Sequence, residues 1–218
     1  MTIPDVFIIE SWGVTDVKIG NLLAANLRST GKNPIFMTVM DSDSYRHALL
    51  IFKASHYRYL HIICHGNASF VSFHRPSSSS PTESISYYDF SNCFPCAMEG
   101  IRVFIAACEL GNQNFSNTLM QSKRYIYSIV APEEVILATQ ALYVWTTFYN
   151  QLFSFEGSSM KSCEMLKYLW KSVKTFNNNF HASIIHPSAK EKFIAHHHLI
   201  PHSTDSYKNP YDSTPIHF

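Results

Sequence analysis

Long apolar runs and clusters of basic residues are both missing from this sequence. No stretch reaches the roughly 18 consecutive apolar residues that a membrane-spanning helix needs, so the sequence predicts no membrane insertion. The net charge is only +1, from 17 basic and 16 acidic side chains, whereas nucleic-acid binding usually depends on clustered lysine and arginine. Residues 1–12 contain Asp5 and Glu10 but no basic residue, which is not the pattern of a secretory signal peptide.

Glycine and cysteine are also scarce. With only seven glycines, the chain has no glycine-rich loop of the kind that cradles phosphates. Its five cysteines, an odd number scattered along the chain, fit reduced thiols in a cytoplasm better than a disulfide framework. At 218 residues with 46% hydrophobic and 15% charged residues, the chain has the length and composition of one globular domain. We therefore expect a cytoplasmic, globular protein.

Strand-like and helix-like segments alternate along most of the chain. Thr15 or Asp16 is expected to cap the first helix, and Pro132 to stand in the first turn of a long one. Buried-type strands are expected over 5–11, 34–40, 59–65, 101–108 and 125–131, and helices over 15–30, 42–57, 113–123, 132–155 and 160–173. This alternation predicts an α/β fold of three αβα layers, with helices on both faces of a mostly parallel sheet.

Two regions depart from the alternation. Residues 70–75 fit a short strand or hairpin arm and 86–92 a short helix, while the Ser/Pro run at 75–84 is typical of a mobile surface loop. Residues 1–176 are expected to form the domain. Residues 177–218, rich in Asn, His, Pro and Ser, are expected to pack on it or to be partly disordered.

Two predicted strands end in residues able to do chemistry. The block YLHIICHG ends in His65 and Gly66. In the block RVFIAACELG, the predicted strand ends at Cys108, and Gly111 follows three residues later. The carboxyl ends of parallel strands gather at one sheet edge, so neighbouring strands about 4.8 Å apart would present both side chains to one cleft. An imidazole activates a thiol and can return its proton to a leaving group, while the Gly66 and Cys108 N–H groups could stabilise an oxyanion.

Either residue alone is more often structural than catalytic. A histidine at a strand end is usually a hydrogen-bonded structural residue, and a buried cysteine usually behaves as a small hydrophobic side chain. The two stand at corresponding strand ends, and each is followed by a nearby glycine. That combination favours a shared reactive cleft.

These blocks resemble the caspase-like cysteine peptidases, most closely the CHAT-type branch related to separases. YLHIICHG resembles the branch's His…His-Gly block, and FIAACELGN its Ala-Cys-x-x-Gly nucleophile block. ALYVWTTFYNQLFSFEG, residues 141–157, resembles a later helix of the family, and SSMKSCEML falls where its last helix begins. The similarity spans residues 5–172, in order and spacing, and implies a caspase-like fold.

The resemblance assigns roles to individual residues. Cys108 would be the nucleophile and His65 the general base and acid, in a dyad that requires no acidic third member. The Gly66 and Cys108 amides would form the oxyanion hole. His61 lies on the same strand face as His65 and would be structural or would support His65 from behind.

Substrate contacts are less sharply indicated. Ala106 stands where caspases have glutamine, so their basic pocket for an aspartate side chain is not implied. Contacts are expected from the loop after the fifth strand, around Ile129, Val130 and Ala131, and from the insertion at 67–90. Four acids are candidates for a pocket that accepts a basic side chain: Asp89, Glu109, Glu133 and Glu134.

The remaining cysteines and histidines do not form a recognisable metal-binding pattern. Strand alternation points Cys64 into the core, away from the cleft. Cys93 and Cys96 have C-x-x-C spacing but lack two further ligands nearby. His196–His198, with His186 and His202, fit a solvated tail, because three consecutive histidines cannot all face one ion. No metal and no cofactor are therefore predicted.

The strand-end residues and the resemblance together predict a cysteine endopeptidase that acts on a protein substrate. The resemblance further implies that an activating or regulatory protein partner switches it on. No direct contact with nucleic acid or membrane is expected. An antiviral or cell-death setting would fit an effector of this kind. Two alternatives stay open: a non-catalytic caspase-like module for protein interaction, and a small-molecule cysteine hydrolase or acyltransferase.

Overall fold

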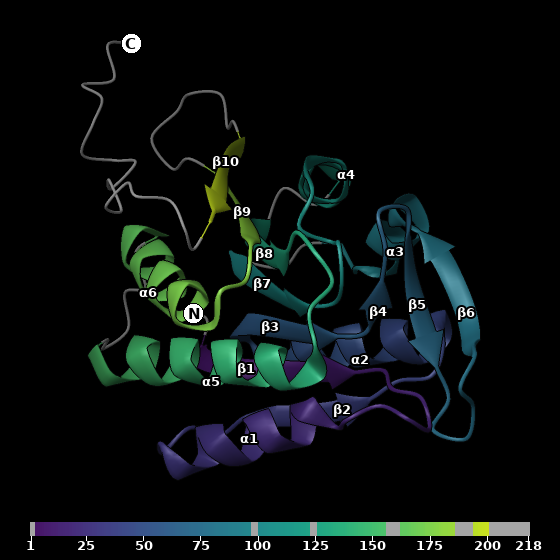
Figure 1. The fold of residues 1–218 in the computed structure, drawn as a ribbon. Coiled ribbons are helices and arrows are strands. Elements are labelled where there is room, and N and C mark those ends of the chain that lie inside the picture. The colour runs from purple at the N-terminus through teal and green to yellow at the C-terminus, as the bar shows by residue number, and fades with distance from the viewer. Residues whose placement is uncertain (1–2, 97–99, 123–125, 156–161, 186–193, 201–218) are drawn as a thin grey trace.

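A computed structural model of the protein describes residues 3–96, 100–122, 126–155, 162–185 and 194–200 (Figure 1). This part of the chain contains six helices: α1 (Ile19–Ser29), α2 (Ser42–Ser55), α3 (Tyr87–Cys93), α4 (Gln113–Ser122), α5 (Ala138–Phe155) and α6 (Ser162–Phe176). The central sheet consists of β1 (Ile3–Glu10), β2 (Ile35–Thr38), β3 (Tyr57–Ile63), β7 (Ile101–Ala106), β8 (Ile126–Pro132), β9 (Phe180–Ile185) and β10 (Ile194–Leu199). A small second sheet contains β4 (His65–Gly66), β5 (Phe70–His74) and β6 (Pro81–Ser86).

The central sheet has seven strands in the order β10-β9-β8-β7-β3-β1-β2. The strands from β2 to β8 pair in parallel, whereas β9 and β10 are antiparallel. Helices cover both faces of the sheet (Figure 1), so the predicted three-layer α/β architecture is confirmed. None of the helices in the described ranges is long and apolar enough to cross a lipid bilayer.

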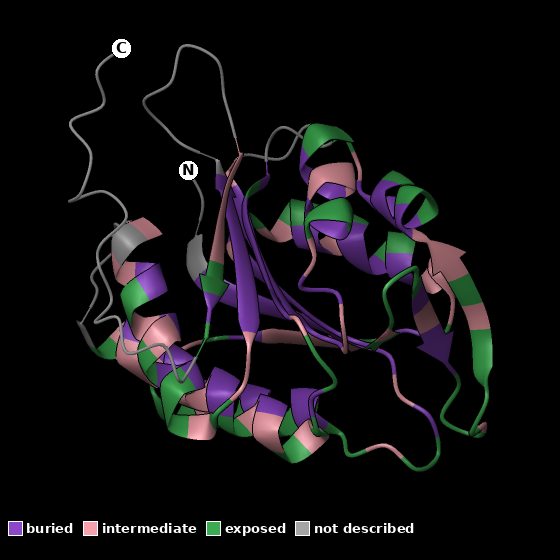
Figure 2. Ribbon diagram, turned by 45° about the horizontal axis from the view of Figure 1, so that its top comes forward, coloured by how far each residue is buried: buried purple, intermediate pink, exposed green. Residues whose placement is uncertain are grey.

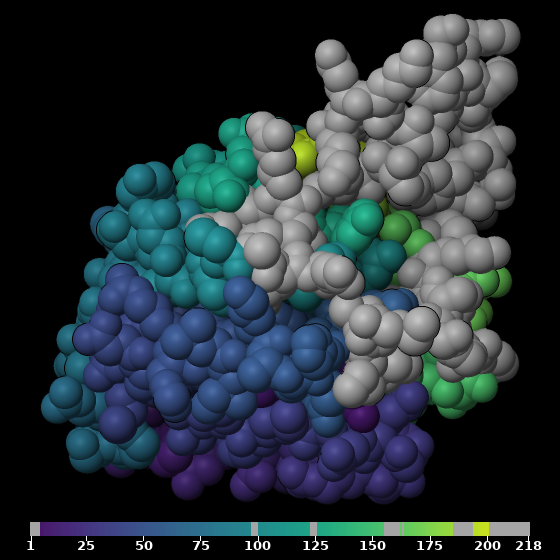
Figure 3. Space-filling model, turned by 180° about the vertical axis from the view of Figure 1, so that it is seen from behind, coloured from purple at the N-terminus to yellow at the C-terminus, as the bar shows by residue number. Residues whose placement is uncertain are grey.

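The core lies in two layers, one on each face of the sheet. Under α1, α5 and α6, the aromatic side chains of Phe104, Trp145 and Tyr149 pack together without exposure to solvent. Under α2, α3 and α4, Tyr45 stacks on Phe90 with 5.1 Å between ring centroids. The strands in between are buried almost throughout (Figure 2), because apolar side chains leave both of their faces. Seen from behind, α2 and the segment from β5 to α3 lie side by side (Figure 3).

The N-termini of α2 and α1 are stabilised in different ways, and the N-terminus of α1 differs from the prediction. Asp41 caps α2 by accepting a hydrogen bond from the Ser44 backbone N–H, while the Ser44 hydroxyl accepts one from the Asp41 N–H. The expected cap of the first helix by Thr15 or Asp16 is wrong, because α1 begins after Lys18, whose side chain makes no capping hydrogen bond. The Asp16 carboxylate is instead engaged by His65 and by the Gly13 N–H.

The long helix begins later than predicted. Pro132 is the last residue of β8, and α5 starts at Ala138, so residues 133–137 form a connection between them. Tertiary hydrogen bonds hold the chain extended here. The Gly111 N–H donates to the Pro132 carbonyl at 2.7 Å, and the Glu133 N–H donates to the Asn179 carbonyl at 3.0 Å. These long-range bonds override the local preference of proline for a first helical turn.

The Ser/Pro run is only partly a loop. Residues 70–74 form β5, as expected, but Pro81–Ser86 form the exposed strand β6, which pairs with β5. Ser72 and Ser84 are cross-strand partners whose hydroxyl oxygens lie 2.7 Å apart. Cross-strand hydrogen bonding of this kind stabilises a hairpin that composition alone does not reveal.

The chain beyond residue 176 contributes two strands to the central sheet. β9 pairs with β8, and β10 pairs with β9. The expectation that His196–His198 form a solvated tail is therefore wrong, because all three belong to β10. Buried Phe180, Ala182, Ile184 and Leu199 anchor these strands against α5 and α6. His186 and His202 lie outside the described residues.

This arrangement predicts the effect of truncation. A chain ending at Phe176 would lose β9 and β10 and leave the β8 edge unpaired beside exposed apolar side chains, a configuration that promotes aggregation. We expect it to yield little cooperatively unfolding protein in a thermal scan followed by circular dichroism. A chain ending at residue 200 keeps both strands and serves as the control. Equal melting temperatures for the two chains would contradict the structural role of this hairpin.

Candidate functional site

His65 and Cys108 follow neighbouring strands. β3 pairs directly with β7, and Ile63 stands opposite Ala106 at the end of the ladder. His65 and Cys108 each come two residues after these partners, so the expected adjacency of the two strand ends is confirmed. Beyond this pair, the Cys64 N–H donates to the Ala106 carbonyl over 3.4 Å.

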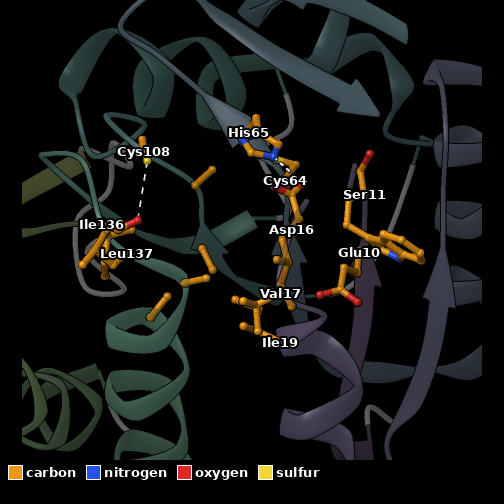
Figure 4. A pocket seen from close by; sticks show the side chains of 16 residues that line it. Glu10, Ser11, Asp16, Val17, Ile19, Cys64, His65, Cys108, Ile136 and Leu137 are labelled. Carbon is orange, nitrogen blue, oxygen red and sulfur yellow. Dashed lines mark hydrogen bonds and ion pairs between the residues drawn. The ribbon is translucent and has the colours of Figure 1, made fainter. Parts of the chain in front are cut away.

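A cavity of about 220 Å³ opens at this edge and is lined by both His65 and Cys108. Figure 4 shows Cys108 with Ile136 and Leu137 on one side of it, and Asp16 among the residues on the other. Four segments therefore contribute to one site: the end of β3, the end of β7, the β1–α1 connection and the β8–α5 connection.

Asp16 holds the imidazole of His65. The Asp16 Oδ2 atom lies 2.7 Å from Nε2 of His65 and also accepts a hydrogen bond of 2.6 Å from the Gly13 N–H. Partial burial pushes the Asp16 pKa upward, but the bonds to His65 and Gly13 outweigh it and hold the pKa below its ordinary value. Asp16 is therefore ionised at neutral pH. Its bond to Nε2 fixes the ring and leaves Nδ1 as the nitrogen for proton transfer.

His74 packs against the same imidazole. The His65 and His74 ring centroids lie 4.3 Å apart, and the His74 backbone N–H donates to the Ser11 hydroxyl at 2.8 Å. Burial and the neighbouring His65 lower the pKa of His74. Asp16, His65 and His74 place their donor atoms within 4.8 Å of one another, so this cluster has the side chains needed to hold a metal ion.

The thiol of Cys108 rests toward the β8–α5 connection. Its Sγ atom donates to the Ile136 carbonyl over 3.8 Å, which is its only hydrogen bond among the described residues. The side chain is half-buried and packs on the core layer under α5.

The residue after Cys108 has an unusual backbone. Glu109 has φ of 59°, in the left-handed region that strains a residue with a side chain by about 1–2 kcal/mol. Its N–H donates to the Glu134 carbonyl at 3.3 Å, and its carboxylate accepts the Ala68 N–H at 3.1 Å. Glu109 thus joins the loops that follow His65 and Cys108, and it is not among the side chains that line the cavity.

The two glycines allow close approach of backbone segments. A Cβ atom on Gly66 would come within 2.8 Å of Leu110 Cγ and 3.0 Å of the Cys108 carbonyl oxygen. At Gly111, a Cβ would come within 2.5 Å of the Ala131 carbonyl oxygen. Neither glycine has positive φ, so the requirement is space and not a left-handed turn. The residues expected to supply oxyanion donors, Gly66 and Cys108, are therefore adjacent in space.

His61 and Cys64 lie inside the core. His61 is fully buried, its Nδ1 lies 3.0 Å from the Tyr149 hydroxyl, and burial lowers its pKa to about 3. It also meets Trp145 edge to face, with 4.9 Å between ring centroids, so it packs as a neutral ring under α5. Cys64 belongs to the opposite core layer, as strand alternation indicates, but it also lines the cavity, so the expectation that it lies away from the cleft is wrong. Burial, with a smaller effect of Cys108, raises the pKa of the Cys64 thiol to about 12, which makes it unreactive.

The residues predicted to contact substrate are dispersed. Ala106 lines the cavity, but Ile129, Val130 and Ala131 are buried within β8 and do not. Asp89 accepts a bond of 2.6 Å from the Ser86 hydroxyl at the start of α3. Glu133 and Glu134 belong to the β8–α5 connection and face the β9 side, where Glu133 binds His198 and Glu134 binds Asn179.

Sequence patterns missed both acids that line the cavity, Asp16 and Glu10. Glu10, at the end of β1, is 1% exposed. Its Oε1 accepts the Gly20 N–H at 2.7 Å, while its Oε2 has no hydrogen-bond partner within the described part of the chain. Burial raises its pKa to about 7, although the bond from Gly20 and the charge of Lys18 act in the opposite direction. An acidic residue at the end of a buried parallel strand was the available signal, since β1 ends at the same edge as β3 and β7.

Comparison of the chain with protein-family models and with curated proteins finds no match. The site is therefore interpreted from its own residues and geometry.

Glu10 predicts a pH dependence of stability. Because its pKa rises from 4.5 to about 7 on folding, the protonated acid stabilises the fold below pH 4.5, and this contribution is lost as the pH rises through 7. Glu10→Gln keeps the acceptor for Gly20 and removes the titration. We expect the variant to be more stable than wild type at pH 8 by up to about 3 kcal/mol, but by less than about 1 kcal/mol at pH 5, in urea unfolding.

The control for this measurement is Asp43→Asn, which neutralises an exposed acid on α2. It should change stability equally at both pH values. A Glu10→Gln variant whose stability relative to wild type is the same at pH 5 and pH 8 would contradict a buried, titrating Glu10.

Proposed function

We propose that this protein is a cysteine endopeptidase that uses Cys108 as nucleophile and His65 as general base and acid. The observation that carries the proposal is the shared cavity: a thiol and an imidazole reach it from the ends of paired strands, and an ionised Asp16 holds the imidazole. The resemblance of the two strand-end blocks to caspase-like peptidases of the CHAT type supports the same conclusion.

The chemistry follows from these groups. His65 takes the thiol proton at Nδ1 as the Cys108 sulfur attacks the carbonyl carbon of the scissile amide. The Gly66 and Cys108 N–H groups bind the oxyanion; one such donor is typically worth about 3 kcal/mol. The C–N bond then breaks, and His65 gives its proton to the departing amine. Water, deprotonated by the same imidazole, hydrolyses the thioester and returns the thiol.

Asp16 changes the dyad into a three-residue arrangement in this proposal. Its carboxylate orients the ring and stabilises the imidazolium that forms when the thiol loses its proton. Asp16 acts through His65 and is therefore a positioning residue. The link between its element and the imidazole is long-range: 49 residues separate Asp16 from His65.

The cavity favours a basic or neutral substrate side chain over an acidic one. Its lining contains the carboxyl groups of Glu10 and Asp16 and no lysine or arginine. An acidic side chain would enter a region of negative potential with no partner, which is costly in a partly desolvated site. This agrees with the absence of the caspase glutamine at Ala106.

The size of the cavity keeps one alternative in view. A volume of about 220 Å³ suits a single side chain or a small acyl group, below the usual range for whole small-molecule ligands of about 300–1,000 Å³. A cysteine hydrolase or acyltransferase with a small acyl substrate would use the same thiol chemistry.

The proposal also includes a cytoplasmic location, where reduced thiols persist, a protein substrate and an activating protein partner.

Covalent labelling tests the nucleophile directly. Wild-type protein and the Cys108→Ala and His65→Ala variants are treated with peptidyl electrophiles carrying Arg, Ala or Asp at the first position, and adducts are counted by intact mass. We expect one adduct per chain, fastest with Arg, absent in Cys108→Ala and slowed about 10²–10⁴-fold in His65→Ala. Cys96, which is exposed and free, is the internal reference thiol.

Labelling of Cys108 no faster than labelling of Cys96 would overturn the proposal and favour a non-catalytic interaction module. Rapid labelling by small acyl electrophiles but not by peptides would instead favour the small-molecule hydrolase.

Asp16→Asn should slow labelling of Cys108 about 10–100-fold because the uncharged amide holds the ring but no longer stabilises the imidazolium. The melting temperature should stay close to that of wild type, since Asp16 is partly exposed. The NMR signal of the His65 Nε2 proton reports the lost charge-assisted hydrogen bond and is unaffected by a general change in packing. Unaltered labelling together with a shifted Nε2 signal would show that Asp16 is dispensable for reactivity.

A further inference from the structure

A second cluster of metal-binding side chains lies on the other side of the β8–α5 connection. Glu133 Oε1 is 2.6 Å from Nδ1 of His198 and 3.7 Å from Nδ1 of His181. All three donor atoms lie within 4.8 Å of one another. The cluster shares no residue with the Cys108 cavity.

The β9–β10 pairing creates this cluster. His198 stands directly opposite His181 in the antiparallel ladder, so the two side chains leave the same face about 5 Å apart. The next pair on that face is His196 opposite Ser183. His197 is opposite Ala182 and faces the other way, toward α5 and α6. The alternation of the strand thus selects two of the three consecutive histidines for one face.

Buried His181 has an unsatisfied ring nitrogen. The residue is 1% exposed, and no described residue forms a hydrogen bond with its Nδ1 atom, although this atom faces the Glu133 carboxylate. Its Nε2 atom lies 3.0 Å from the Ser183 hydroxyl, which in turn lies 2.9 Å from Nδ1 of His196. In one consistent set of protons, His181 Nε2–H donates to Ser183 and Ser183 donates to His196. That set leaves a lone pair on Nδ1 of His181 facing a carboxylate oxygen.

We propose that Glu133, His181 and His198 bind a Zn²⁺ ion. Zinc prefers imidazole nitrogen and carboxylate oxygen, and a tetrahedral site places its donor atoms about 3.3 Å apart. The observed separations of 2.6 Å and 3.7 Å to the Glu133 oxygen bracket this value, so only small side-chain shifts are needed. His198 is 54% exposed, which leaves room for water as the fourth ligand. Ser183 and His196 supply the outer hydrogen bonds that fix a ligating histidine.

The ion would also act on the segment that borders the reactive thiol. Glu133 begins the β8–α5 connection, and the same connection carries Ile136, whose carbonyl accepts the Cys108 thiol. The Glu133 N–H is already bound to the Asn179 carbonyl before β9. Zinc binding to Glu133 would tie this connection to the hairpin through a second, stronger link. The site is thus placed to stabilise the geometry of the cavity without entering it.

The test is zinc titration of the metal-free full chain by isothermal calorimetry, with Co²⁺ absorption as the probe of ligand type. We expect one ion per chain at micromolar affinity or tighter, and a cobalt spectrum without a thiolate charge-transfer band. Glu133→Gln and His198→Asn should each weaken binding at least about tenfold. Both changes conserve shape at exposed or half-buried positions, so unchanged melting temperatures of the metal-free variants confirm folding.

Two matched variants locate the ion. His197→Asn alters the neighbouring histidine of β10 on the opposite face and should bind zinc as wild type does. His65→Ala dismantles the Asp16, His65 and His74 cluster and should also retain the site. Zinc at a hundred times its dissociation constant should raise the wild-type melting temperature by roughly 5–10 °C and slow hydrogen exchange in residues 133–137.

Three results would overturn the proposal. The first is the absence of binding tighter than about 0.1 mM in the wild type. The second is unchanged affinity in both Glu133→Gln and His198→Asn. The third is loss of the ion in His65→Ala alone, which would assign the metal to the cavity cluster. None of these readouts depends on peptidase activity, so the zinc site stands or falls separately from the proposed function.

Discussion

The parallel pairing of β3 with β7 is the constraint on which the rest of this structure depends. With Ile63 opposite Ala106, the side chains two residues further along each strand emerge at the same sheet edge. Core packing holds this register, because alternate side chains of both strands are committed to different core layers. A slip by one residue would exchange the faces and turn Cys108 toward the opposite layer. The geometry of the proposed site is therefore maintained by the apolar residues that precede it.

The connection between β8 and α5 is the second organising element. The Glu134 carbonyl in this connection accepts the Glu109 N–H, and the Ile136 carbonyl accepts the Cys108 thiol. The Glu133 side chain contacts His198 of the C-terminal hairpin. Few apolar anchors hold it, since Val135 and Leu137 are 67% and 63% exposed. Segments held mainly by hydrogen bonds and little buried area open more easily than core strands. The zinc site that we propose at Glu133 would reinforce this weakly anchored part of the molecule.

Sequence patterns predict helices and strands well where burial determines the structure. They predict them poorly where contacts between residues far apart in sequence determine it. The apolar strands and the paired ends at His65 and Cys108 were recognisable because burial on both faces leaves continuous hydrophobic runs. The Asp16 contact was not, because an acid before a helix is usually a cap and its partner is far along the chain. β10 was hidden by its histidines, which interrupt the apolar pattern of an edge strand. The local sequence predicts a helix at Pro132, because the hydrogen bonds from other segments that hold this residue in a strand cannot be recognised from local sequence.

The two carboxyl groups of the cavity differ in pKa because their surroundings differ. Asp16 keeps its charge because His65 and Gly13 bind it, while Glu10 lies deeper, has one oxygen without a partner, and feels the charge of Asp16 as a further cause that raises its pKa. At neutral pH the cavity therefore holds one full negative charge and one group near its titration midpoint. A cationic side chain that enters would favour the ionised form of Glu10 and displace its proton to solvent. Binding of such a substrate would thus be coupled to proton release, whereas binding of a neutral side chain would not. This coupling links substrate charge to the buried acid at the end of β1.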